Sequence, residues 1–293
     1  MTYCVAMRLD AGLVFLSDSR TNAGVDQIST FRKMTVFEHP GERLLVLMSA
    51  GNLAVTQAVR QIVCERTGPN DHSVWTAKTM FDAVRIVGDA VREVYARDAH
   101  ALKDAGIEFN CNFILGGQIR GEHTRLFQVY AAGNFIEATP ENPYFQIGES
   151  KYGKPIIDRV ISPHTPLDEA AKCALVSMDS TLRSNISVGL PLDLLVYEEG
   201  RLAVTKFVQI DQHNQYMQMI RNTWGARLKQ VFQEIPDPAW RDAPADTGSP
   251  RLETDPTSPV RAPLPAGLQT AGKPVVQVQL VADGGAGGST MPR

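Results

Sequence analysis

The second residue of the chain could act as a nucleophile. Thr2 follows the initiator methionine, and removal of Met1 before such a small residue would expose an α-amine next to a β-hydroxyl. A hydroxyl is a weak nucleophile unless a base lies beside it, and an N-terminal amine, with an unperturbed pKa of about 7.7–8.0, can be that base. Many chains begin Met-Thr or Met-Ser, so this signal taken alone also fits an incidental terminus.

Asp18 and Lys33 could assist such a nucleophile. Asp18 ends a predicted strand that a hairpin would bring beside the chain start, and Lys33 stands just before the next strand. A nearby carboxylate stabilises the charged form of a lysine, whereas a second ammonium disfavours it. Lys33 could therefore take part in deprotonating the hydroxyl. Taken singly, Asp18 also fits a turn cap, and Lys33 fits a solvated loop.

Two predicted hairpins would position these residues. Short apolar runs are separated by turn-forming residues, Asp10-Ala11-Gly12 in the first hairpin and His39-Pro40-Gly41 in the second. The expected strands are residues 3–9 with 13–17 and residues 34–37 with 43–49. Consecutive hairpins of this kind predict antiparallel sheets.

The rest of the chain alternates blocks of helices with further strands. Apolar residues at helical spacing predict helices through residues 55–63 and 80–94, one beginning near Pro166, and a last one over 211–234. The remaining strands are expected at 113–119, 125–130, 144–147, 192–197 and 202–208. This order predicts an α+β fold, a four-layer αββα sandwich with two antiparallel sheets.

Composition excludes several classes of protein. The 293 residues carry 29 Lys and Arg against 32 Asp and Glu, a net charge of −3, without a basic block that would indicate nucleic acid or an anionic membrane as a partner. No run of 18 apolar residues is present for a membrane span. Arg8 and Asp10 interrupt the apolar core that a signal peptide needs, so we expect a cytoplasmic protein.

The sequence predicts neither a metal site nor a cofactor. The four cysteines are far apart and are expected to be reduced core residues, and the six histidines show no metal-ligand spacing. Phosphate-binding and dinucleotide-binding fingerprints are absent from the sequence, which argues against an ATPase or a dinucleotide-dependent enzyme. An ATPase partner that unfolds substrates is not evident, and it would be a separate chain.

Proline content divides the chain near residue 235. Eight prolines lie in residues 1–235 and ten in the last 58 residues. We expect one domain over 1–235 and a Pro/Gly/Ala-rich, disordered tail over 236–293, because such a composition buries little apolar surface. Within this tail, residues 275–281 alternate like a strand.

Three N-terminal motifs carry a family resemblance. They are T-Y-C-V at residues 2–5, S-D-S-R-T-N-A-G at 17–24 and S-T-F-R-K-M at 29–34. In this order and spacing they resemble the proteasome β-subunit superfamily, and more closely its bacterial Anbu branch, the ancestral β-subunit proteins. The resemblance extends from residue 2 to about residue 240.

The resemblance implies an N-terminal-nucleophile hydrolase fold and roles for particular residues. Thr2 matches the nucleophile, Asp18 the acid and Lys33 the lysine, although the stretch between the last two is one residue shorter than in typical subunits. Gly51 matches the donor of an oxyanion-binding N–H, at a helix start where negative charge is favoured. A glycine there could also simply ease the turn. The resemblance also implies that an extended substrate peptide adds as a strand beside the loop that contains Thr21, Asn22 and Gly24.

Farther along the chain the match to the family loosens. Either Glu149 or Ser150 can occupy the place of a family serine. Counting back from the last hairpin puts Ser184 and Ser187 at the positions of a family Asp and Ser, and Asp179 is an alternative source of the carboxylate. The family also implies ring-like or open-spiral homo-oligomers.

These observations predict a threonine peptidase or amidase that acts on a peptide or other amide through an acyl-enzyme. Two alternatives remain. One is a catalytically silent assembly or binding protein on the same fold. The other is an amidase for small γ-glutamyl or aminoacyl compounds.

Overall fold

A computed structural model describes the chain except residues 1, 24–26, 69–71, 237–238, 243–277 and 282–293. The chain forms two compact units, Met1–Ala226 and Arg227–Arg293. The boundary falls within the last helix, α5 (Gln215–Glu234). Each unit is described by itself.

One five-stranded antiparallel sheet contains the start of the chain. Its order is β10-β1-β2-β11-β12, with β1 (Tyr3–Leu9) and β2 (Gly12–Asp18) paired as a hairpin. β10 (Tyr144–Gly148) flanks β1, while β11 (Leu192–Glu198) and β12 (Lys206–Ile210) extend the other side. Cys4, Ser17 and Asp193 lie in one row across β1, β2 and β11.

A second five-stranded antiparallel sheet follows the order β5-β6-β7-β8-β9. Its strands are β5 (Met34–His39), β6 (Arg43–Gly51), β7 (Cys111–Ile119), β8 (Arg125–Val129) and β9 (Phe135–Glu137). A separate two-stranded hairpin, β3 (Arg20–Ala23) with β4 (Gln27–Thr30), connects the two sheets in sequence.

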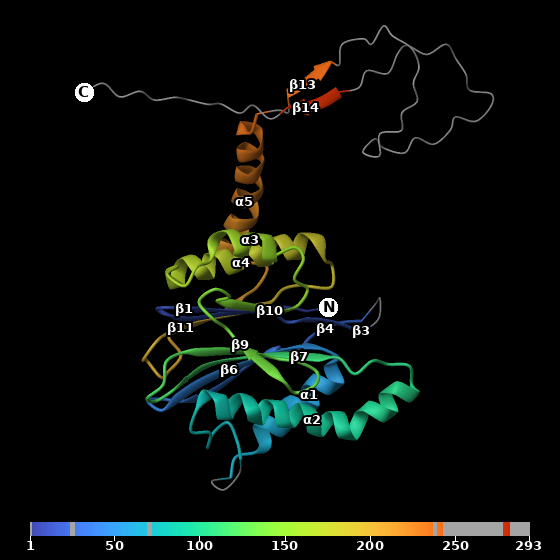
Figure 1. The fold of residues 1–293 in the computed structure, drawn as a ribbon, viewed down its shortest axis with the longest axis vertical. Coiled ribbons are helices and arrows are strands. Elements are labelled where there is room, and N and C mark those ends of the chain that lie inside the picture. The colour runs from blue at the N-terminus through green and yellow to red at the C-terminus, as the bar shows by residue number, and fades with distance from the viewer. Residues whose placement is uncertain (1, 24–26, 69–71, 237–238, 243–277, 282–293) are drawn as a thin grey trace, which may run out of the picture. The chain divides into compact units, whose positions relative to one another are not determined.

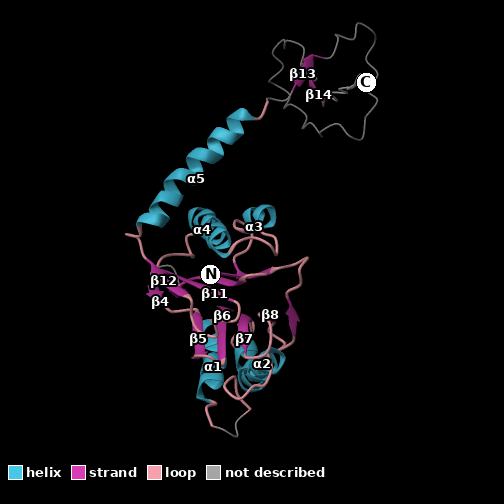
Figure 2. Ribbon diagram, turned by 90° about the vertical axis from the view of Figure 1, so that its left-hand side faces the viewer, coloured by secondary structure: helices cyan, strands magenta, loops and turns pink. Residues whose placement is uncertain are grey.

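Helices cover the outer face of each sheet (Figure 1). α1 (Leu53–Glu65) and α2 (Met80–Asp104) lie against the second sheet, and α3 (Lys154–Val160) and α4 (Leu167–Ser184) lie against the first. A view turned by 90° shows the same four layers, helix–sheet–sheet–helix (Figure 2). The predicted αββα sandwich is therefore confirmed.

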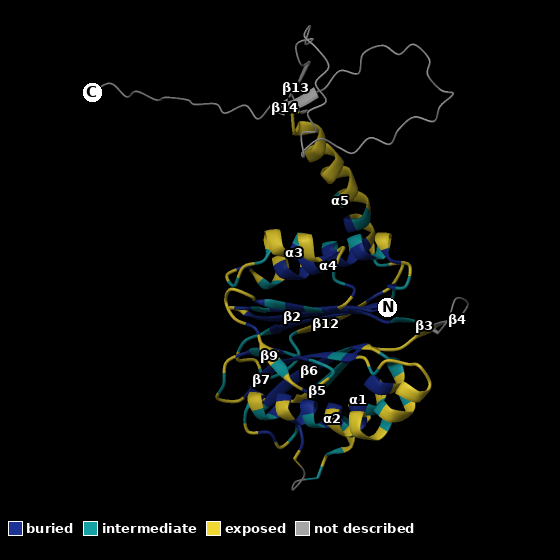
Figure 3. Ribbon diagram, turned by 45° about the vertical axis from the view of Figure 1, so that its right-hand side comes forward, coloured by how far each residue is buried: buried dark blue, intermediate teal, exposed yellow. Residues whose placement is uncertain are grey.

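Burial explains why the strands near the chain start are almost continuously apolar. Along β1, Tyr3, Val5 and Met7 pack toward the helices, whereas Cys4 and Ala6 pack between the two sheets. Both faces of this strand are buried, so polar alternation is lost. Figure 3 shows buried strands in the middle of the first unit and exposed surfaces on its helices.

Two elements begin four residues later than the sequence predicts. β12 was expected at 202–208 but begins at Lys206, because Gly200 and Leu202 adopt positive φ angles of 84° and 48°, which a strand does not accommodate. The last helix was expected from 211 but begins at Gln215. There Asn214 accepts a hydrogen bond from Met217 N–H at 3.0 Å, which caps the helix start.

In the second unit, β13 (Ala239–Asp242) pairs with β14 (Val278–Val281). β14 falls within the predicted strand at 275–281, whose first three residues lie outside the described part of the chain. Most of the tail predicted to be disordered also lies outside it, so that expectation and the domain boundary at 235 stay predictions. No helix in the described ranges has the length and apolar character needed to cross a bilayer.

Candidate active site

Thr2 is held at the end of the first sheet by the neighbouring strand. Its carbonyl accepts a hydrogen bond from Glu149 N–H at 2.6 Å, and only 9% of the residue is exposed. Gly148 permits this close approach, because its φ is +84° and a Cβ there would lie 2.0 Å from the Thr2 oxygen. Any side chain at residue 148 would displace Thr2 or the strand end.

Asp18 and Lys33 form a buried ion pair beside Thr2. Lys33 Nζ lies 2.6 Å from Asp18 Oδ1 and donates a second hydrogen bond to the Arg20 carbonyl at 2.7 Å. The Asp18 residue is 0% exposed and Lys33 is 8% exposed. Tyr3 N–H also donates to Asp18 Oδ1, at 3.0 Å, which ties this carboxylate to the start of β1. The fold thus brings together the three predicted N-terminal residues.

Electrostatics at this pair reflect two opposing effects. Burial raises the pKa of the Asp18 carboxyl above its usual range, while the Lys33 ammonium and the Tyr3 and Gly189 N–H groups counteract that rise. Cys4 pairs across β1 and β2 with Ser17, the residue before Asp18. Burial raises the pKa of the Cys4 thiol far above its usual range. The thiol is therefore protonated and cannot compete with Thr2 as a nucleophile.

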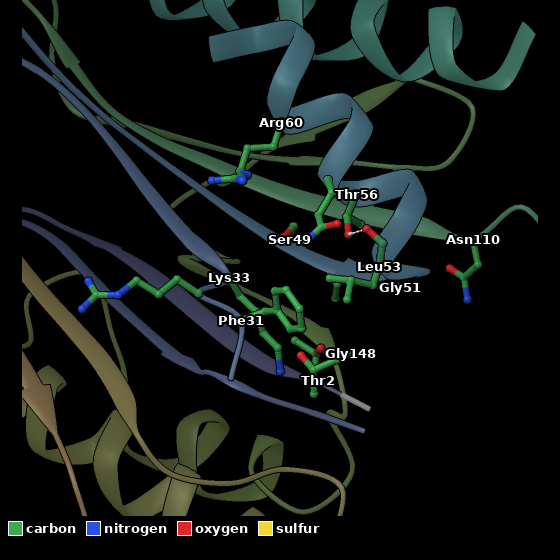
Figure 4. A pocket seen from close by; sticks show the side chains of 14 residues that line it. Thr2, Phe31, Lys33, Ser49, Gly51, Leu53, Thr56, Arg60, Asn110 and Gly148 are labelled. Atoms are coloured by element: carbon green, nitrogen blue, oxygen red, sulfur yellow. Dashed lines mark hydrogen bonds between the residues drawn. The ribbon is translucent and has the colours of Figure 1, made fainter. Parts of the chain in front are cut away.

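A cavity of about 520 Å³ opens in front of Thr2. Its lining residues come from the chain start just before β1, the segment before β5, the end of β6 and one face of α1, and they include Thr2, Lys33, Ser49, Gly51, Leu53 and Arg60. In Figure 4 the ammonium end of Lys33 lies beside Thr2, with Gly51 and Leu53 on the opposing wall. A volume of this size suits the acyl part of a small molecule or a peptide side chain.

Gly51 is the last residue of β6 and lines the same cavity. Its φ is +119°, and a Cβ would lie 2.4 Å from the Asn110 carbonyl oxygen. Asn52 follows as the N-cap of α1: its side chain accepts from Ala54 N–H at 3.0 Å, and its own N–H donates to the Asn110 carbonyl at 2.8 Å. The helix start, with its partial positive charge, is thus fixed next to Thr2.

The downstream candidates are distributed differently from the N-terminal residues. Ser150 lines another cavity of about 470 Å³. Asp179, on α4, is 1% exposed and accepts hydrogen bonds from Arg183 and Arg221 at 3.2 and 3.3 Å. Ser184 is exposed at the end of α4, and Ser187 lies in the following loop. None of these residues is among the described residues that line the Thr2 cavity.

Glu149 and Asn185 form a polar contact behind Thr2. Glu149 is 7% exposed, and its Oε2 accepts a hydrogen bond from Asn185 Nδ2 at 3.0 Å, while its Oε1 accepts from Lys151 N–H at 2.9 Å. Sequence reasoning named Glu149 only as one of two alternatives and missed Asn185. No sequence spacing links residues 36 positions apart, so only the packing of α4 against the first sheet reveals this pair.

Of the predicted substrate-strand residues, Thr21 lines the cavity. Asn22 belongs to β3, and Gly24 lies outside the described residues. Over the described ranges, no three His, Cys, Asp or Glu side chains are grouped so that they could bind a metal ion.

The two helix-covered sheets, with Thr2 beside a buried Asp–Lys pair, define the N-terminal-nucleophile hydrolase type of fold. Comparison with solved structures gives a narrower result. Anbu (ancestral beta-subunit) from Yersinia bercovieri is 55% identical, with a TM-score of 0.76, over 80% of this chain and 98% of that one. The chain belongs to the Anbu family.

Two further Anbu structures support the assignment. Anbu from Hyphomicrobium sp. strain MC1 is 50% identical with a TM-score of 0.75, covering 80% of this chain and 99% of that one. The Pseudomonas aeruginosa Anbu complex, which forms a helical assembly, is 48% identical with a TM-score of 0.78, covering 81% and 98%. No protein-family model matches the chain, and neither does any curated protein sequence.

Proposed function

We propose that the protein is a threonine hydrolase, a peptidase or amidase whose nucleophile is Thr2 after removal of Met1. The observation that carries this proposal is the buried Asp18–Lys33 pair, joined at 2.6 Å, whose ammonium lies beside Thr2 at the wall of the cavity. Removing two charges from water is costly, so a buried pair at the wall of a cavity favours a role in the chemistry there. A lysine ammonium fixed next to a hydroxyl favours loss of the hydroxyl proton, because it stabilises the negative charge that develops on the oxygen.

The first half of the reaction acylates Thr2. Its Oγ attacks the carbonyl carbon of the substrate amide, and the α-amine of Thr2 accepts the hydroxyl proton. Lys33, joined to Asp18 at 2.6 Å, lies beside Thr2 and lowers the cost of developing negative charge on Oγ. Negative charge that develops on the substrate oxygen is stabilised by Gly51 N–H, at the end of β6 just before the N-cap of α1. The C–N bond then breaks, the amine product leaves with the proton from the Thr2 ammonium, and an ester remains.

The second half of the reaction releases the acyl group. A water molecule gives a proton to the Thr2 amine and attacks the ester carbonyl, through the same oxyanion position. The ester C–O bond breaks, Thr2 Oγ takes the proton back, and the carboxylic acid product leaves. No cofactor takes part in either half.

The proposal extends to the form of the protein in the cell. We place the hydrolase in the cytoplasm, as a domain over residues 1–235 with a tail over 236–293, assembled as a ring or open spiral of identical subunits. Support for the assembly comes from the helical assembly of the P. aeruginosa Anbu complex. Peptides or other amides are the substrates, and an ATP-driven unfolding partner would be a separate chain.

A silent assembly protein on the same fold is the second candidate. It is favoured by the positions of Ser150, Asp179 and Ser184, which leave the Thr2 cavity without the family's downstream serines and acid among its described lining residues. An amidase for small γ-glutamyl or aminoacyl compounds is the third, and the cavity of about 520 Å³ is large enough for such an acyl group.

The experiment compares the untagged protein with its Thr2→Ala and Thr2→Ser variants on small amides, short peptides and an unfolded protein. We expect turnover by the wild type, reduced turnover by Thr2→Ser and none by Thr2→Ala with an unchanged circular dichroism spectrum. Equal turnover by Thr2→Ala and the wild type would refute the proposal. Absence of turnover by a wild type that has lost Met1 would favour the silent assembly protein.

A further inference from the structure

One face of α1 forms a wall of the Thr2 cavity. Leu53, Thr56, Gln57 and Arg60 all line it, and their spacing of i, i+3, i+4 and i+7 places them on a single side of the helix. The Thr56 hydroxyl is already used, because it donates to the Asn52 and Leu53 carbonyls at 3.1 Å. Arg60 is the charged residue of this face.

The cavity is cationic, and its cations differ in how far they are neutralised. Arg32, Lys33 and Arg60 line it, and no Asp or Glu does so among the described residues. Lys33 is paired with Asp18 at 2.6 Å, and Arg32 lies 4.0 Å from Asp193. For Arg60, the described part of the chain offers no carboxylate within ion-pair distance. Figure 4 shows its side chain on the cavity side of α1, across from Lys33 and Thr2.

We propose that Arg60 binds a carboxylate on the acyl part of the substrate, so that the enzyme prefers acidic acyl groups; this inference rests on the hydrolase function proposed above. An arginine fork matches a carboxylate with two parallel hydrogen bonds. The same chemistry can come from two sources. One is the side chain of a glutamate that precedes the scissile amide, and the other is the α-carboxylate of a γ-glutamyl amide.

The position of Arg60 along α1 favours a long acidic side chain on the substrate. Arg60 lies seven residues beyond Leu53, a rise of about 10 Å along α1. Long side chains on a helix tend to lean back toward its N-terminus, the end at which Gly51 and the cavity lie. A glutamate or γ-glutamyl group reaches farther than an aspartate, so glutamate is the expected acid.

The test uses pairs of substrates that differ in one charge. Peptide amides with Glu or Gln before the scissile bond are compared by kcat/KM, and a γ-glutamyl amide is compared with its α-decarboxylated analogue. We expect the acidic member of one pair to be favoured about fivefold, the size of a partly solvated ion pair. Which pair shows the preference identifies the source of the carboxylate.

Variants of Arg60 connect the preference to this residue. Arg60→Ala is expected to abolish the preference, and Arg60→Glu to reverse it in favour of a Lys-containing peptide. Arg97→Ala is the matched control, because it removes an equal charge from an exposed pair with Asp98 outside the cavity. An acidic preference that is absent in the wild type, or that survives Arg60→Ala, overturns the inference.

Binding separates this inference from the hydrolase function. In the Thr2→Ala background, titration calorimetry compares the affinities for the Glu and Gln peptides with and without Arg60→Ala. Tighter binding of the Glu peptide that depends on Arg60 supports the carboxylate site even when no substrate is hydrolysed. Equal affinities for both peptides overturn the site, whether or not hydrolysis is observed.

Discussion

Lys33 depends on Asp18 for compensation of its charge inside the protein. The two charged atoms lie 2.6 Å apart, and at an effective dielectric constant of about 20 their Coulomb attraction is about 6 kcal/mol. Part of this attraction offsets the cost of removing both groups from water. Asp18→Asn leaves a buried ammonium whose acceptors, the introduced amide oxygen and the Arg20 carbonyl, carry no compensating charge, so we expect a loss of about 3–5 kcal/mol in the free energy of unfolding.

A double-mutant cycle measures the interaction directly. Lys33→Met keeps the length of the side chain and removes its charge, leaving a buried carboxyl that can become protonated because burial already raises its pKa. We expect the double variant Asp18→Asn/Lys33→Met to lose at least about 2 kcal/mol less than the sum of the single variants. The assay is equilibrium unfolding in urea at one fixed protomer concentration, because assembly would otherwise shift apparent stability.

The exposed pair of Lys206 and Asp168 is the control for this cycle. It joins the same residue types at 3.1 Å, but its side chains are 56% and 84% exposed, so its coupling energy is expected to stay below about 1 kcal/mol. A coupling energy at Asp18 and Lys33 no larger than that of the control would contradict this prediction, because the buried ion pair would then contribute no more to folding stability than an exposed one.

Two further predictions concern the surroundings of the site. Gly148→Ala should lose at least about 2 kcal/mol more stability than Gly200→Ala, since both glycines have a φ of 84° but only at Gly148 would the Cβ meet an atom, the Thr2 oxygen at 2.0 Å. Equal losses in thermal unfolding would contradict this. Burial raises the pKa of Asp193, so its folded form binds a proton more readily than the unfolded chain, and stability falls as pH rises above about 4. Asp193→Asn should therefore gain stability relative to the wild type as pH rises from about 4 to the raised pKa of Asp193, and a constant difference in melting temperature over that range would rule this out.

Sequence patterns predicted the layers of the fold because apolar periodicity reports burial directly. The hairpin of β1 and β2, the α1 and α2 helices and the final pair of strands all follow from it. The short elements β3, β4, β9 and α3 were not predicted. The three strands contain at most two apolar residues each, and α3 has only about two turns, so none of them shows a period.

The N-terminal residues of the site could be predicted, but its downstream part could not. Thr2, Asp18 and Lys33 lie in adjoining strands and turns, so local hairpin geometry is enough to bring them together. Glu149 and Asn185 meet only through the packing of α4 on the first sheet. The role of Arg60 in lining the cavity was also missed, although its spacing from Leu53 on α1 was visible in the sequence.

The most direct test of the nucleophile is the intact mass of the untagged protein before and after incubation with a peptide β-lactone, which acylates a reactive hydroxyl without losing a leaving group. We predict that the mass lacks one methionine and then gains one label per chain. Thr2→Ala should gain none. Retention of Met1 without a label, or equal labelling of Thr2→Ala, would contradict an N-terminal threonine hydrolase.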